Sequence, residues 1–218
     1  MENFLGYKKF SPPFAKREVP AEKIEKFRGH LPDKLLEYWQ VYGWCGYANG
    51  LFWTVDPDEW EGELESWIGD TDLMEKDAYY VIGRSAFGKL FLWGKNSGQS
   101  LKVNTPWGMI FPSFNEEEFK DDGPDLTLQL FFSVLSRDGL DEEDEKEKPL
   151  FERALKKLGV LDHNTMYGFV PALALGGTPK LENLQKLDAH VHLDILSQVT
   201  ERQIMRDIVA DARDAGLA

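Results

Sequence analysis

Apolar residues recur at helical spacing over the first part of the chain. Residues 19–29 predict a short helix, because Pro20 suits its first turn and Gly29 suits its end. Residues 32–42 predict a second helix. The apolar residues that fall on one side of this second helix are Leu35, Leu36, Trp39 and Tyr42.

Downstream, the pattern changes to short apolar and aromatic runs that are typical of strands. Residues 47–55 form an aromatic segment, and Asn49-Gly50 within it is a turn-forming pair. Asp56 as N-cap and Pro57 at the first helical position predict that a helix begins next. Four further strands are expected at residues 79–82, 89–93, 100–104 and 108–111. Their connections are too short for parallel crossovers, so we expect an antiparallel meander.

The rest of the chain is expected to be mainly helical. Helices are predicted at residues 125–136, 149–158 and 200–215, the last with a capping box formed by Thr200 and Gln203. The residues of the first of these helices that can pack inward are Leu126, Leu130, Phe131 and Leu135. An acidic run at residues 138–147 is expected to be a solvated loop or helix face.

These elements predict an α+β fold. Helices are expected to flank an antiparallel sheet in the N-terminal part, and a smaller, mostly helical domain is expected to follow it. The predicted domains span residues 1–124 and 125–218, with the acidic run near 138–147 in the second one.

The charge balance narrows the choice of partner. With 38 acidic and 25 basic residues, the chain carries a formal net charge of −13. This argues against nucleic acid as a direct ligand, because binding to phosphates needs clustered lysine and arginine. It favours a basic protein partner, although the charge can also serve solubility alone.

Other features bear on location and on chemistry. No apolar run approaches the roughly 20 residues that span a bilayer, and the N-terminus shows no secretory signal, so we expect a cytoplasmic protein. Cys45 is the only cysteine, which excludes an internal disulfide and a cysteine cluster for zinc. There is no G-x-S-x-G motif and no carboxylate pair in an apolar setting, so no catalytic residue is predicted.

Residues 166–194 support two incompatible readings. Residues 166–177 look like the buried body of a small binding domain. The segment after them carries alternating polar residues that, on a strand, would place four potential metal ligands along one face. These residues are Asp188, His190, His192 and Asp194. The pattern superficially resembles the HxH of metal-dependent amidohydrolases, which lies on an early strand of a barrel of more than about 200 residues.

Here the histidines lie close to the end of the sequence, with no later strands to supply further ligands. We therefore favour an amphipathic edge strand or a helix with solvated polar groups, and expect neither metal nor cofactor. A metal-dependent hydrolase that uses these four residues remains the alternative.

Two groups of acidic residues are candidate contacts for a basic partner. The first surrounds Trp60 and Trp67, and it comprises Asp56, Asp58, Glu59, Glu61, Glu63 and Glu65. Acids beside exposed aromatic side chains would combine steering with an anchor, but the tryptophans can equally belong to the core. The second group, expected in a loop, comprises Glu116, Glu117, Glu118, Asp121 and Asp122.

Several strings carry a family resemblance. In the second half they are FERALKKLGVL (151–161), YGFVPALALGG (167–177), Asn183-Leu184 and HVHL (190–193). Together they resemble the C-terminal domain of a bacterial type VI secretion immunity family. Residues 31–43, 49–52 and 82–94 resemble the GAD-like domain that is usually fused ahead of it, and more loosely SMI1/KNR4-type immunity proteins.

This resemblance implies a protein that binds and neutralises a co-produced toxin, which degrades DNA in known members, and it implies no catalytic residues. We therefore expect a non-enzymatic immunity protein that binds a cognate basic nuclease toxin stoichiometrically and covers its active site or DNA-binding surface. It should bind neither nucleic acid directly nor a membrane. A general SMI1/KNR4-like interaction module with a non-toxin partner is a further alternative.

Overall fold

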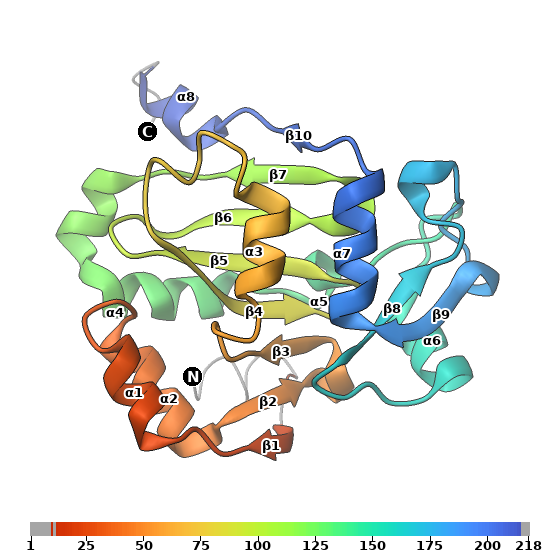
Figure 1. The fold of residues 1–218 in the computed structure, drawn as a ribbon, viewed down its shortest axis with the longest axis horizontal. Helices are drawn as coiled ribbons and strands as arrows, with labels where there is room; N and C mark the ends of the chain where they lie inside the picture. Colours follow the sequence, from red (N-terminus) through yellow and green to blue (C-terminus); the bar gives the residue numbers. More distant parts are fainter. Residues whose placement is uncertain (1–9, 11, 215–218) are drawn as a thin grey trace.

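An eight-stranded sheet runs through the middle of the molecule (Figure 1). The computed structural model describes residue 10 and residues 12–214. The strands, in sheet order, are β1 (Phe14–Arg17), β2 (Trp44–Tyr47), β3 (Phe52–Thr54), β4 (Tyr79–Ser85), β5 (Lys89–Gly94), β6 (Gly98–Asn104), β7 (Met109–Pro112) and β10 (Gln203–Ile204). Neighbours from β1 to β7 are antiparallel, which confirms the predicted meander.

Helices cover both faces of this sheet. In the view of Figure 1, α3 (Glu61–Ile68) and α7 (Ala189–Val199) lie in front of it, and α4 (Glu116–Val134) lies behind. Phe131 of α4 packs with its ring 5.6 Å from that of Phe91 in β5. Because both faces are covered, all six residues of β5 are buried, including Lys89.

The remaining helices border the sheet. They are α1 (Ala21–Phe27), α2 (Asp33–Tyr42), α5 (Arg137–Leu140), α6 (Phe151–Leu158) and α8 (Ile208–Asp214), with short 3₁₀ turns η2 (Ala48–Gly50), η3 (Thr105–Trp107), η4 (Leu173–Leu175) and η5 (Leu181–Asn183). Among the described residues no helix is both long enough and apolar enough to pass through a bilayer. The helices predicted at 19–29, 32–42 and 149–158 are confirmed, and so is the α+β class.

The C-terminal part adds a small second sheet. Strands β8 (Thr165–Phe169) and β9 (Leu184–Asp188) pair antiparallel, and α7 then returns the chain to the large sheet. Tyr167 and Phe169 are buried, as expected, but Val170 and Leu175 are 41% and 62% exposed. The apolar string that starts in β8 is thus only half in the core, because the chain leaves the strand after Phe169.

Two predicted helices begin at different residues. The helix expected from Asp56 begins at Glu61, because the Asp56 side chain accepts a hydrogen bond from Asp58 N at 3.1 Å and stabilises a separate turn. The helix expected at residue 125 begins at Glu116.

In α4 the residues Gly123 and Pro124 form a kink, with a φ of 74° at the glycine, instead of a helix boundary. The division expected between residues 124 and 125 lies at this kink and stays a prediction. Leu126 and Leu130, expected to pack inward, are 44% and 42% exposed, whereas Leu128 is buried beside Phe131.

The helix predicted at 200–215 is wrong over its first turns. Thr200 ends α7, since its N–H donates to Leu196 O at 2.9 Å. Gln203 N donates to Gly108 O at 2.8 Å, so this segment forms β10, parallel to β7. Pairing with the free edge of β7 outweighs the local helix signal, because an unpaired sheet edge leaves backbone groups without partners. Helical structure resumes only at Ile208.

The acidic run at 138–147 is largely exposed, but Glu142 departs from the expectation and is 7% exposed. Its Oε1 lies 3.0 Å from Lys89 Nζ, and Trp107 Nε1 donates to its Oε2 at 2.9 Å. The run is therefore tied to the sheet, because a buried lysine at the start of β5 requires an acidic partner.

Glycine 168 sets how closely α7 approaches β8. A methyl group at Gly168 would lie 2.9 Å from Leu187 Cδ1 and closer still to the His192 ring, whereas one at Gly62 in α3 would meet no atom within 4 Å. We expect Gly168→Ala to lower the free energy of unfolding by about 1–3 kcal/mol through overpacking. Gly62→Ala should raise it by up to about 1 kcal/mol, because alanine favours a helix. Urea denaturation of both variants measures this, and equal effects would contradict the proposed packing.

Candidate functional site

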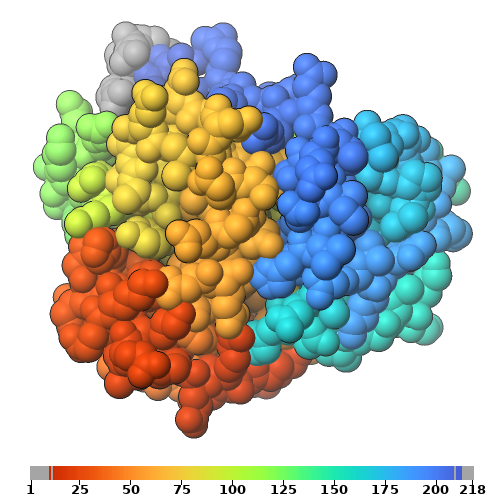
Figure 2. Space-filling model, viewed as in Figure 1, coloured from red at the N-terminus to blue at the C-terminus, as the bar shows by residue number. Residues whose placement is uncertain are grey.

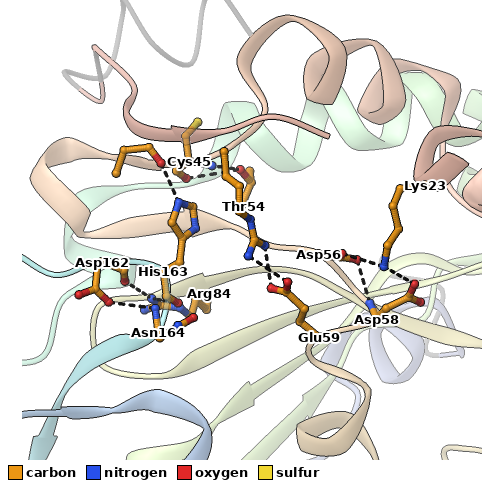
Figure 3. A network of polar contacts seen from close by, with 12 residues as sticks. Lys23, Cys45, Thr54, Asp56, Asp58, Glu59, Arg84, Asp162, His163 and Asn164 are labelled. Carbon is orange, nitrogen blue, oxygen red and sulfur yellow. Dashed lines mark hydrogen bonds and ion pairs between the residues drawn. The ribbon is translucent and has the colours of Figure 1, made fainter. Parts of the chain in front are cut away.

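The first predicted acidic group is divided between buried, paired and exposed positions. Asp56 is 2% exposed, and its carboxylate lies 2.9 Å from Lys23 Nζ (Figure 3). Asp58 contacts the same lysine and also Lys26, at 2.6 Å. Burial opposes ionisation of Asp58, but the hydrogen bonds from the two lysines outweigh it and hold the pKa of Asp58 below its usual value. Both acids are thus neutralised by cations of α1.

Glu59 and Glu63 also have partners inside the molecule. The Glu59 carboxylate accepts hydrogen bonds from both terminal guanidinium nitrogens of Arg17 in β1, at 2.9 and 2.7 Å. Glu63 is 7% exposed, and its Oε1 lies 2.7 Å from His190 Nδ1 on α7. This hydrogen bond raises the pKa of His190 above its usual value although burial of the ring opposes it. Glu63 therefore joins α3 to α7 instead of facing solvent.

Glu61 and Glu65 are the two acids of this group that remain available. Both are exposed and lie one turn apart on α3. Within the described residues neither carboxylate takes part in an ion pair. Trp60 and Trp67 are 2% and 0% exposed, so these tryptophans belong to the core and offer no exposed aromatic anchor.

The second predicted acidic group lies on a helix and not in a loop. The Asn115 side chain accepts a hydrogen bond from Glu118 N and so caps α4 at its start. Glu116, Glu117, Glu118 and Asp121 are exposed, and Asp122 is partly exposed. Lys120 offers only a 4.0 Å contact to Glu116, with both side chains largely in solvent. Acidic side chains in the first turn also suit the positive end of a helix, so this part of the group contributes to helix stability.

Arg84 on β4 has no part in the sequence-based prediction and is the most deeply buried charge described. It is 0% exposed, and burial lowers its pKa to about 9, so it remains charged at neutral pH. Its Nη2 lies within hydrogen-bonding distance of three main-chain carbonyls, two in the loop before β8 and one at the first residue of β8. These are the carbonyls of Asp162 at 2.9 Å, His163 at 3.0 Å and Thr165 at 3.0 Å. Figure 3 shows the arginine beside Asp162 and His163 of this loop.

Aromatic rings enclose this guanidinium on two sides. Its carbon atom lies 5.2 Å from the ring centre of Trp53 and 5.5 Å from that of Trp60. Two histidines extend this arrangement: the His163 ring meets Trp53 edge to face with 5.0 Å between ring centres, and the His190 ring is tilted against Trp60 at 4.8 Å. The N-terminal half supplies the arginine and the tryptophans, while the C-terminal half supplies the histidines and carbonyls.

A second arginine holds the end of α3. Arg202, which precedes β10, donates to the carbonyls of Ser66 and Trp67 at 3.1 and 3.2 Å. Its two terminal nitrogens also reach the Asp70 carboxylate, at 2.7 and 2.6 Å. Carbonyls at the last turn of a helix lack helical partners and attract cations, so this contact stabilises α3.

The segment with two histidines forms no strand face of metal ligands. It divides into the end of β9 and the helix α7, and Asp188 caps that helix by accepting from Val191 N at 3.0 Å. His190 binds Glu63, whereas burial against β8 lowers the pKa of His192. The part of the chain that the structure describes contains no group of three or more histidine, cysteine, aspartate or glutamate residues placed to hold a metal ion.

The fold and the strings that shape it agree with known families. The family model of the GAD-like domain matches residues 1–107, and that described as T6SS immunity protein Tdi1, C-terminal, matches residues 125–200. The chain therefore belongs to the type VI secretion immunity proteins that carry an N-terminal GAD-like domain. This membership supports an immunity function with a secreted toxin as the partner.

The fold is also found among solved structures. The crystal structure of Atu4351 from Agrobacterium tumefaciens is similar over 94% of this chain and 91% of that chain, with a TM-score of 0.82 and 21% sequence identity. No curated protein matches the chain.

We expect Arg84→Met to lower the free energy of unfolding by about 3–5 kcal/mol, because it leaves buried carbonyls without a donor. Arg137→Met is the matched control. Arg137 forms a surface pair with Glu152 at 2.6 Å, and such pairs contribute at most about 1 kcal/mol. Urea denaturation gives both values, and a loss at Arg84 no larger than that at Arg137 would contradict this role.

The His190–Glu63 contact should weaken as the pH rises. Because folding raises the pKa of His190, its contribution is fully present below the unfolded value near 6.5 and is lost as the pH rises through the folded value. Asp188 supports the charged form and Arg84 opposes it. A double-mutant cycle with His190→Gln and Glu63→Gln should give a coupling energy on the order of 1 kcal/mol at pH 6 that declines by pH 9.

The control cycle pairs His163→Gln with the same glutamate variant. His163 binds Ala15 O at 2.7 Å, so its coupling to Glu63 should be near zero at both pH values. A His190–Glu63 coupling that does not change with pH would show that the ring titrates outside this range.

Proposed function

We propose that this protein is a cytoplasmic, non-enzymatic immunity protein that neutralises a cognate DNase toxin by forming a stoichiometric complex. The observation that carries the proposal is the match of residues 125–200 to the immunity family. Inhibition occurs by occupation of the active site or the DNA-binding surface of the toxin.

The charge of the chain supports a nuclease as the target. A DNase must present a basic surface to the phosphates of its substrate. The net charge of −13 lets this protein compete for that surface and accelerates the encounter. An acidic inhibitor therefore suits a basic toxin better than it suits a toxin that acts on a neutral or cationic substrate.

The exposed members of the two acidic groups are the proposed contacts. In the first group these are mainly Glu61 and Glu65 on α3, and in the second group they are the acids at the start of α4. Asp56 and Glu63 are buried, so they support the first surface from below instead of meeting the toxin directly. We propose the GAD-like part, residues 1–124, and the immunity part, residues 125–218, as the two domains.

Co-expression provides the direct test. The toxin encoded beside this chain should kill cells or degrade their DNA when produced alone, and this protein should abolish both effects. The purified pair should elute as a 1:1 complex, and its association rate should fall as salt screens the opposite charges. A DNase without this immunity partner is the control and should remain fully active. A cognate toxin that stays lethal, with no complex on size exclusion, would refute the proposal.

A further inference from the structure

A groove of about 460 Å³ lies between α1, α3 and the start of β4. Most of its lining is apolar or aromatic. Its lining includes the apolar side chains of Phe27, Leu64 and Met74 and the ring of Tyr79. Tyr80 is partly exposed, and its hydroxyl is 3.0 Å from His30 Nδ1, which fixes the ring at the edge of the groove. In Figure 2 the two elements that border it, α1 in red and α3 in orange, both lie on the visible surface.

Acidic side chains form the rim of this groove. Asp58, Glu61 and Glu65 all line it, and the only cations among its lining residues are Lys26 and, when protonated, His30. Lys26 is paired with Asp58 at 2.6 Å. Two negative charges, those of Glu61 and Glu65, therefore remain at the rim without a cation.

Neither an ion pair within the protein nor the helix dipole explains why both of these positions are acidic. Glu61 lies in the first turn of α3, where the helix dipole favours a negative charge, but Glu65 lies beyond it. The neighbouring acids of the same segment are each held by a cationic partner from β1, α1 or α7. Within residues 56–65, the acids without a cationic partner are thus Glu61 and Glu65, which lie where the apolar groove opens.

We propose that this groove receives a lysine or arginine side chain of the toxin, and the inference rests on the proposed function. The aliphatic stem packs along Phe27 and Leu64, and the cationic head is held by Glu61 and Glu65. Long basic side chains bury their methylene groups while keeping their charge in a polar setting, which matches an apolar lining with an acidic rim. The face of Tyr80 adds a cation–π contact.

Charge reversal tests the rim. Binding is measured by surface plasmon resonance to the toxin encoded beside this chain, produced with an inactivating substitution in its active site. The double variant Glu61→Lys/Glu65→Lys should bind at least about tenfold more weakly and mainly associate more slowly. The control Glu143→Lys/Glu182→Lys makes the same change in net charge at two exposed acids that neither line the groove nor belong to the proposed contacts, and it should bind within about threefold of the unmodified protein. Equal losses in both variants would show general steering and overturn the groove.

Substitution of Met74 separates a basic occupant from an apolar one. A basic side chain predicts that Met74→Lys weakens binding at least about tenfold more than Met74→Glu, because only the lysine repels it. An apolar occupant predicts similar losses for both, which would overturn the inference. Thermal unfolding of each variant checks that the fold is kept, and losses are compared only between variants with matching midpoints.

The outcomes separate this inference from the proposed function. If the unmodified protein does not bind the toxin, both are wrong. If it binds and the reversal at Glu61 and Glu65 has no effect, the groove is wrong and the immunity function stands.

Discussion

The buried charge of Arg84 is the constraint on which the arrangement of the two halves depends. A guanidinium without solvent must find acceptors, and here none of its hydrogen-bond acceptors is a carboxylate. The main-chain carbonyls of Asp162, His163 and Thr165 take that place, so this segment lies where β4 directs the Arg84 side chain. Once the loop is fixed, β8 follows directly, and Tyr167 N bonds to Ala86 O at 2.9 Å. This hydrogen bond joins β8 of the C-terminal part to the turn between β4 and β5 of the large sheet.

The distribution of acids follows from the same rule, namely that a buried charge needs a partner. The chain has more carboxylates than cations. The least exposed carboxylates, such as those of Asp56 and Glu142, are paired with lysines. Asp56 takes Lys23, and Glu142 takes Lys89. Most of the described acids without an ion pair are exposed to water, whereas Asp141 accepts from main-chain N–H groups and burial raises its pKa to about 6. The fold therefore determines where the unpaired acids lie on the surface, and composition alone does not define these positions.

Local signals allowed most of the fold to be predicted, and long-range pairing accounts for the rest. Proline, glycine and apolar spacing locate α1, α2 and the meander, because those elements also pack as their own patterns require. The segment after Thr200 shows the limit, since its helix signal is overridden by the edge of β7. The partners of Glu63 and Arg84 are separated from them by 127 and up to 81 residues, so no spacing rule finds them. One signal was available, namely a single arginine, Arg84, between the apolar runs at residues 79–82 and 89–93, because a charge within an apolar stretch indicates a buried structural or functional group.

The position of α3 links these points to the function. This helix belongs to the segment that matches the GAD-like domain, yet it is held from the other half of the chain. His190 binds it through Glu63 near its start, and Arg202 binds the carbonyls of its last turn. Glu65 lies between these two attachments and Glu61 lies two residues before the first, so residues of the C-terminal part hold both acids in position. A partner surface on α3 is consequently a property of the whole chain, and an isolated GAD-like segment would carry the same acids without the contacts that orient them.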